Sequence, residues 1–281
     1  MIKRRSTLIG KQANLFTTNM DLFLDKTLED LNLEYNDGFS GKLNPTFSTS
    51  NYRKSIFQKS PHYENQAEIP LFNLFKLHGS VTWKAQEDKI IFDKNLSILN
   101  DVKKTDPGND LIIEFNHENG EPKKIKKLIS DAVNYQKSKK VDAFLSAYSQ
   151  MVIINPTKDK FSTTTTQYTF YELLRMYSNE LEKENSVLFV FGFSFADEHI
   201  REITKRVANS NPTLLVCVFA YDLNAKNDIA SKLVLTDFKF NNLEIIIAGS
   251  FLEVNKVWFS NLARQLDTNQ YPKESVKEET K

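Results

Sequence analysis

A histidine closes a strongly apolar stretch in the first third of the chain. Residues 71–83 read LFNLFKLHGSVTW, in which the apolar run breaks at Lys76 and stops at His78-Gly79. An imidazole transfers protons near neutral pH, so a strand that ends at His78 can deliver a general base to the mouth of a pocket. The alternative is that the strand simply ends there in a turn, where a histidine before a glycine is common.

A second polar group follows an apolar strand nearer the N-terminus. The run ANLFTTN (13–19) leads directly into a segment with helical spacing, and its polar end supplies Thr17, Thr18, Asn19 and Asp21. Ligands of open α/β sheets bind at the carboxyl ends of strands, beside helix N-termini. The Asn19 amide can donate and accept, which suits sugar hydroxyls or a positioned water. The alternative is that Asp21 or Thr18 caps the helix.

A third strand end reads Phe191-Gly192-Phe193-Ser194. Glycine allows a ligand to approach the backbone closely, and Ser194 provides a hydroxyl. Glycine is also common wherever a strand turns into a helix, so this segment alone does not define a site.

The elements that must position these residues are clearest in the C-terminal half. Apolar runs predict strands, and amphipathic spacing predicts helices between them. The strands are expected at 151–156, 186–195, 213–222 and 243–249, and the helices at 168–184, 197–210, 224–238 and 251–266. This alternation is typical of an α/β fold with a doubly wound, mostly parallel sheet. Because the strands lack polar alternation, we expect both faces of the sheet to be covered.

The remaining segments complete a domain that we expect to span residues 1–270. Its N-terminal part (10–35 and 71–93) contains a helix at 20–33 and a hairpin at 81–93, and the polar stretch 36–69 is predicted to be a long loop. An inserted, partly helical lobe is expected at 100–150, before the C-terminal half (151–266), and a charged tail at 271–281.

The composition excludes several classes of protein. The 281 residues are 40% hydrophobic and carry a formal net charge of +1, which gives no general reason to expect a nucleic acid or an anionic membrane as partner. Cys217 is the single cysteine, so the chain can form no internal disulfide and no cysteine zinc site. No apolar stretch is long enough for a membrane helix. We expect a soluble cytoplasmic protein without a metal.

Taken together, the segments TTNMD, KLHGSVTW and GFSFADEHI occur in this order, each after an apolar strand. This constellation resembles the sirtuin-like superfamily, and specifically its zinc-less bacterial branch found in anti-phage defence proteins, over roughly residues 10–255. The resemblance implies a Rossmann-like sheet and NAD as substrate. It also implies cleavage of the nicotinamide–ribose bond, which yields nicotinamide and ADP-ribose.

The resemblance also implies roles for individual residues. Asn19 is expected to position the ribose and the attacking water, and His78 to act as general base near the ribose hydroxyls. Such roles suit a reaction that passes through a cation-like sugar. That reaction needs a ribose fixed in position and a base close enough to accept a proton. Asp21 is expected beside the nicotinamide carboxamide. Gly192 and Ser194 are expected to approach the ribose and phosphate on the adenosine side. We also predict that Thr17, Thr18, Gly79 and Asp222 bind the cofactor.

The chain departs from the family in three ways. It lacks the four cysteines of the zinc ribbon that deacylating sirtuins carry, which disfavours protein deacylation. Only IKRRSTLIGKQ, with Gly10, precedes the first apolar strand, so we expect the family's first strand and its glycine-rich phosphate loop to be missing. Truncation, a loop supplied by another chain, or lost cofactor binding would each explain this. Met20 stands where the branch more often has an aromatic residue.

Other functions remain open at this stage. The chain can instead be a catalytically impaired subunit that binds NAD or ADP-ribose, or a scaffold of a defence complex. The resemblance implies a homo-oligomer and, in some relatives, a hexameric DNA-translocase ATPase as partner. The run Lys123–Lys140 contains seven lysines and one aspartate and can contact DNA, although such a run is more often a solvated face.

Overall fold

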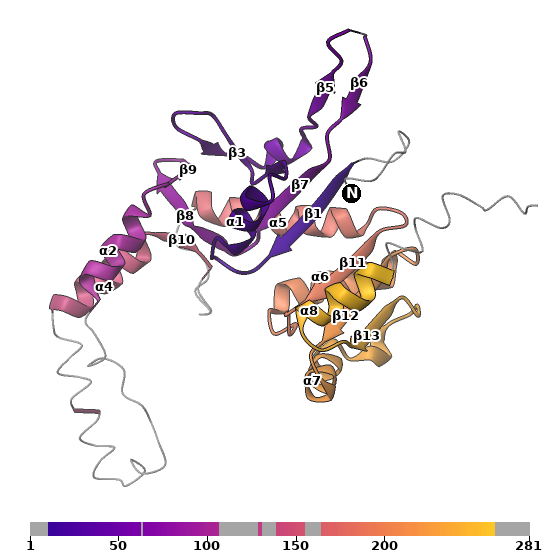
Figure 1. Ribbon diagram of the computed structural model, residues 1–281. Helices are drawn as coiled ribbons and strands as arrows, with labels where there is room; N and C mark the ends of the chain where they lie inside the picture. The colour runs from indigo at the N-terminus through magenta and orange to yellow at the C-terminus, as the bar shows by residue number, and fades with distance from the viewer. Residues whose placement is uncertain (1–10, 63, 107–128, 131–138, 155–163, 262–281) are drawn as a thin grey trace, which may run out of the picture. The chain divides into compact units, whose positions relative to one another are not determined.

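The chain forms two compact units (Figure 1). The computed structural model describes residues 11–62, 64–106, 129–130, 139–154 and 164–261. Unit 1 extends to Leu174 and unit 2 begins at Arg175, so that helix α5 (Thr164–Leu181) contributes to both. The fold is mixed α/β, and each unit contains a parallel sheet.

The parallel sheet of unit 1 has β7 (Leu71–Lys76) at its centre, between β1 (Gln12–Thr17) and β2 (Tyr35–Asn36). The central strand is almost fully buried, in agreement with its apolar sequence. The ring of Phe75 lies between the rings of Phe16 and Tyr52, with centroid distances of 4.6 and 4.0 Å. This aromatic stack fixes β7 in the core of the unit.

A second, antiparallel sheet continues directly from β7. Its order is β10 (Met151–Ile153), β8 (Gly79–Gln86), β9 (Lys89–Phe92), β4 (Thr46–Phe47) and β3 (Phe39–Ser40). The pair β8 and β9 is the hairpin predicted at 81–93, and that prediction is confirmed. Only Leu77 and His78 join the end of β7 to the start of β8, so His78 lies at the corner between the two sheets.

The prediction of a long loop over 36–69 is wrong. The segment contains the end of β2, the strands β3 and β4, and a 3₁₀ helix (η1, Thr49–Arg53). It also contains a hairpin of β5 (Phe57–Lys59) and β6 (Gln66–Glu68), which extends away from the rest of unit 1 (Figure 1). Its asparagines organise backbone: the Asn51 amide donates to the Gly38 carbonyl at 2.8 Å, and Asn51 is buried. Aromatic residues then anchor the segment, since Phe47 packs on buried Trp83 at 4.6 Å.

The helices of unit 1 are short. The predicted helix at 20–33 is α1 (Phe23–Asp30), which buries Leu28. In the inserted lobe, α2 (Ser97–Thr105) packs against α4 (Lys139–Ser149), as Figure 1 shows. Most of the basic run 123–140 lies outside the described residues, so its predicted DNA contact stays a prediction.

Unit 2 confirms the predicted alternation of strands and helices from residue 186 onward, whereas the strand predicted at 151–156 is β10, which pairs antiparallel with β8 in unit 1. The strands β11 (Val187–Phe191), β12 (Leu215–Ala220) and β13 (Leu243–Ile247) pair in parallel in this order. They alternate with α6 (Glu198–Ser210), α7 (Leu223–Leu233) and α8 (Phe251–Val254). One turn of 3₁₀ helix, η4 (Leu235–Asp237), follows α7, and a π-helical stretch, η5 (Asn255–Phe259), follows α8. The predicted helix at 224–238 ends early because Val234 has a left-handed φ of 51°.

Among the described residues, the two faces of this sheet differ in burial. One face carries Val216 and Val218, which are almost fully buried. The other face carries Val187 and Leu215, which are 50% and 43% exposed. Rings from α8 and η5 contact only the aromatic end of this face, where Phe259 packs against Phe191 and Phe219. The prediction that a face of this sheet is covered is confirmed for Val216 and Val218, and for the face of Val187 and Leu215 it stays a prediction.

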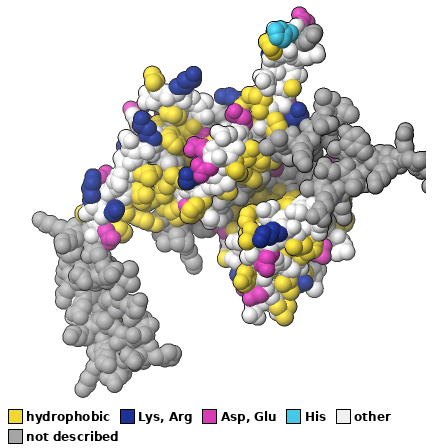
Figure 2. Space-filling model, viewed as in Figure 1, with side chains coloured by type: hydrophobic (Ala, Val, Ile, Leu, Met, Phe, Trp, Pro, Cys, Tyr) yellow, Lys and Arg dark blue, Asp and Glu magenta, His cyan; other side chains and the backbone are white. Residues whose placement is uncertain are grey.

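Apolar side chains are also present on the surface of both units (Figure 2). In the part of the chain that the structure describes, no helix has the length and apolar character needed to cross a membrane.

Candidate functional site

The structure brings the TTNMD and KLHGS segments together in unit 1. Strand β1 pairs with β7 in parallel, with Thr17 beside Lys76, so both segments follow the carboxyl ends of neighbouring strands. Backbone hydrogen bonds then join the two segments: the Leu77 N–H donates to the Thr17 carbonyl at 2.9 Å, and the Val81 N–H donates to the Met20 carbonyl at 3.1 Å. The edge of a parallel sheet where ligands commonly bind is therefore lined by both segments.

The polar residues of the turn between β1 and α1 differ in what their side chains contact. The Thr17 hydroxyl accepts a hydrogen bond from the Asn19 N–H at 3.0 Å, which shapes the turn. Asn19 is exposed, and its carboxamide has no hydrogen-bond partner among the described residues. The Asp21 carboxylate accepts from the Phe23 N–H at the start of α1 at 3.0 Å. Asp21 thus bonds to a backbone N–H near the helix end, but the N-cap residue of α1 is Leu22, without a side-chain cap, so the alternative that Asp21 or Thr18 caps the helix is not confirmed. Half-buried Thr18 makes no side-chain hydrogen bond to described residues.

His78 and Gly79 form the corner between the two sheets. His78 is half-buried, and its backbone carbonyl accepts from the Ile154 N–H at 3.0 Å. Gly79 has a left-handed φ of +80°, and a Cβ there would lie 2.0 Å from the Val152 carbonyl oxygen. The glycine of the KLHGS segment is therefore required by the close approach of β10, while the neighbouring imidazole is the part of the segment that can do chemistry.

In unit 2, the turn from β11 to α6 carries Gly192 and Ser194. Gly192 has a φ of +60°, and a Cβ added to it would meet no atom within 4 Å. Ser194 is exposed, and buried Phe195 also has a left-handed φ, of 55°. Asp197 then caps α6 by accepting from the Ile200 N–H at 3.1 Å. Two left-handed residues within four positions make an unusual turn that leaves open space at Gly192.

Asp222 follows the neighbouring strand of the same sheet. It is exposed and caps α7, since its carboxylate accepts from the Ala225 N–H at 2.8 Å. Because β11 and β12 are parallel neighbours, Gly192 and Asp222 follow carboxyl ends at the same edge of the sheet. Helix capping accounts for an aspartate at this position without any ligand. The nucleotide-binding role of Asp222 stays a prediction.

The nine predicted site residues therefore fall into two groups. Unit 1 gathers Thr17, Thr18, Asn19, Asp21, His78 and Gly79, and unit 2 gathers Gly192, Ser194 and Asp222. Sequence reasoning missed the pair that underlies the first group: the buried ammonium of Lys76 lies 2.7 Å from the carboxylate of Asp25. The signal was present, since Lys76 is the charged residue of a mostly apolar run, but its partner on α1 could not be identified from spacing.

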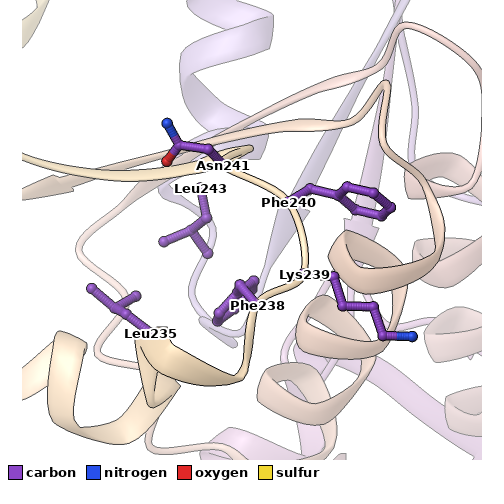
Figure 3. Close-up of a pocket in the computed structure, with 6 residues that line it drawn as sticks. All are labelled: Leu235, Phe238, Lys239, Phe240, Asn241 and Leu243. Carbon is purple, nitrogen blue, oxygen red and sulfur yellow. The ribbon is translucent and has the colours of Figure 1, made fainter.

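A surface hollow of about 380 Å³ lies elsewhere in unit 2 (Figure 3). It is lined by Leu235, Phe238, Lys239, Phe240, Asn241 and Leu243. In Figure 3 the side chains of Leu235, Phe238 and Leu243 face the hollow, whereas the polar ends of Lys239 and Asn241 point away from it. Leu243 is the first residue of β13, so the hollow lies at the opposite end of the sheet from Gly192 and Asp222. It contains none of the predicted site residues.

Comparison with known proteins adds an independent observation. A family model described as a SIR2-like domain matches residues 144–239. The match supports a sirtuin-like domain in this chain. It runs from α4 to the loop after η4 and includes Gly192, Ser194 and Asp222, but it does not reach the TTNMD and KLHGS segments. No curated protein matches the chain.

SIR2-like domains use NAD, so the match suggests an NAD-related function. Among the described residues, no cluster of three or more His, Cys, Asp or Glu side chains could hold a metal ion.

Proposed function

We propose that the chain is an NAD⁺ hydrolase that cleaves the nicotinamide–ribose bond to give nicotinamide and ADP-ribose. The observation that carries the proposal is the hydrogen-bonded pairing of the TTNMD and KLHGS segments, which puts Asn19 and His78 at the same sheet edge. The SIR2-like match over 144–239 supports NAD as the substrate. The fold that accompanies this proposal is the doubly wound, Rossmann-like arrangement implied by the resemblance, and the parallel sheets are consistent with it.

The chemistry assigns a distinct task to each side chain. As the glycosidic bond breaks, positive charge develops on the ribose, and the exposed Asn19 carboxamide can orient the ribose and the attacking water. The His78 imidazole accepts a proton as water adds, so that NAD⁺ and water become nicotinamide, ADP-ribose and a proton. Asp21 can accept a hydrogen bond from the nicotinamide carboxamide. Open space at Gly192 suits close approach of the adenosine side of NAD to the backbone.

The test is the release of nicotinamide from NAD⁺ by the purified chain and by His78→Ala and Asn19→Ala variants. We expect each substitution to lower the rate by about a hundredfold or more, because each removes a group that acts in the transition state. The matched controls are His62→Ala and Asn65→Ala, since both residues are exposed and lie in the connection between β5 and β6. The controls should retain the wild-type rate.

A second candidate is a non-catalytic subunit that binds NAD or ADP-ribose. The observation that favours it is that Gly79 and Asp222 have structural explanations, a close strand contact and a helix cap, which require no ligand. This candidate predicts binding of ADP-ribose by the folded chain without nicotinamide release, and wild-type binding by His78→Ala. Release by the wild type that Asn19→Ala abolishes would exclude it.

The biological setting rests on the resemblance alone. We propose that NAD depletion serves anti-phage defence, that the chain acts as a homo-oligomer, and that a hexameric DNA-translocase ATPase can be its partner.

A further inference from the structure

Lys76 is a charged residue in the core of unit 1. It is the last residue of β7, and its side chain is only 4% exposed. Lysine is almost never buried to this extent unless it is paired, because the ammonium loses its hydration. The partner is Asp25 in the first turn of α1, whose carboxylate is 15% exposed and lies 2.7 Å from the ammonium.

The same ammonium also contacts the candidate site. Lys76 Nζ donates a hydrogen bond to the backbone carbonyl of Asp21, the last residue of the TTNMD turn. The same nitrogen is therefore hydrogen-bonded to the turn carbonyl and paired by charge with the helix carboxylate. Lys76 thereby connects three elements: the end of β7, the turn that carries Asn19, and the start of α1.

Other charged groups near the pair do not replace Asp25 as the partner of Lys76. Burial raises the pKa of Asp37, and the neighbouring Asp25 carboxylate raises it further, although Lys76 and hydrogen bonds from the backbone act in the opposite direction. The Asp37 carboxylate accepts from the Phe39 N–H at 3.0 Å and so stabilises the local turn at residues 37–39. Asp25 is the carboxylate that pairs with Lys76 in the described structure.

A purely structural role does not explain the buried pair well. A buried ion pair adds little stability compared with well-packed apolar residues of similar size, because both charges lose their hydration. What the pair does provide is position, since the ammonium donates a hydrogen bond to the Asp21 carbonyl while the Asp25 carboxylate, 2.7 Å away and without a hydrogen-bond partner for this oxygen, holds the ammonium by charge. Packing between apolar side chains would not fix the turn in this way.

We propose that Lys76, paired with Asp25, is a positioning residue that holds the Thr17–Asp21 turn in the geometry that presents Asn19 to the substrate. This inference deepens the proposed NAD⁺ hydrolase and rests on it. Lys76 does not contact the substrate; it acts through the Asp21 carbonyl.

The test removes both charges together, because a single substitution would leave the other charge buried without a partner. The variant is Lys76→Met with Asp25→Leu. The matched control is Lys26→Met with Asp30→Leu, which removes the Lys26–Asp30 pair from the same helix, where both side chains are more than 60% exposed. Two quantities are measured for each protein: the kcat of nicotinamide release, and deuterium uptake by backbone amides 17–23.

We expect the Lys76 and Asp25 variant to fold, to lose about tenfold or more in kcat, and to take up deuterium faster across the turn. The control should match the wild type in both quantities. If the apolar variant does not fold, Lys76→Gln with Asp25→Asn applies the same test, because the shorter glutamine retains a polar pair but does not extend as far as lysine.

Several outcomes would overturn the inference. A folded variant with wild-type kcat and wild-type uptake would show that the pair does not position the turn. A loss of kcat with unchanged uptake would mean that Lys76 acts by another route. If the wild type releases no nicotinamide, the proposed function fails, yet the uptake measurement still decides whether Lys76 holds the turn.

Discussion

Two glycines of the candidate site have left-handed backbone conformations but different surroundings. Gly79 (φ +80°) lies against β10, where a Cβ would overlap the Val152 carbonyl oxygen, whereas a Cβ at Gly192 (φ +60°) would enter open space. Substitution by alanine therefore distinguishes a glycine that the fold requires, Gly79, from a glycine that a ligand can approach, Gly192.

We expect Gly79→Ala to lower the free energy of unfolding by about 3 kcal/mol or more, because a backbone atom of β10 must move in addition to the strained φ. Gly192→Ala should cost only about 1–2 kcal/mol, the usual penalty for an alanine in the left-handed region. Urea unfolding measures both values. A Gly79→Ala protein as stable as Gly192→Ala would contradict the close approach of β10.

The Gly192→Ala protein also tests the ligand. Because the added methyl group occupies the space at the end of β11, we expect ADP-ribose binding, measured by calorimetry, to weaken by about tenfold. Wild-type affinity in a folded Gly192→Ala protein would remove Gly192 from the predicted binding residues.

At the level of elements, the sequence predicted the parts whose pattern is local. Apolar runs with regular spacing identified β7, the β8–β9 hairpin and the strands and helices of unit 2. The segment 36–69 was mistaken for a loop because its strands are two or three residues long and are held by asparagine side chains and by Phe47 packing on Trp83. Those contacts join residues far apart in sequence, so spacing alone could not reveal them.

The candidate site, like the fold, could be predicted from the sequence only where the pattern is local. The three strand ends were visible as polar residues after apolar runs, and the structure places each of them at the carboxyl end of a parallel strand. The pair of Lys76 with Asp25 was not predictable, because a β7 residue meets an α1 residue through tertiary packing. The sequence also could not show that Gly79 is required by β10.

The N-terminus of α7 allows capping to be separated from ligand binding at Asp222. Asparagine is as good a cap as aspartate, so Asp222→Asn should retain the hydrogen bond to the Ala225 N–H and the stability of the wild type. Asp222→Ala should lose about 1 kcal/mol in urea unfolding. If the carboxylate also binds a ribose hydroxyl, Asp222→Asn should bind ADP-ribose about tenfold more weakly at unchanged stability. Wild-type binding by Asp222→Asn would leave Asp222 with its capping role alone.

For the whole molecule, the central question is whether both units take part in ligand binding. The predicted catalytic residues Asn19 and His78 belong to unit 1. Unit 2 contains Gly192 and Ser194, together with the part of the SIR2-like match that follows Leu174. The proposed function requires ligand binding at each of the two groups.

Hydrogen exchange with and without ADP-ribose tests this requirement on the full chain. We expect saturating ADP-ribose to slow exchange at amides 17–23 in unit 1 and at amides 192–197 in unit 2, because bound ligand restricts the opening of both turns. Amides of the β5–β6 hairpin, which extends away from the rest of unit 1, provide the internal control and should exchange as before (Figure 1). Protection confined to unit 2 would make it a nucleotide-binding unit on its own, and would contradict the catalytic roles proposed for Asn19 and His78.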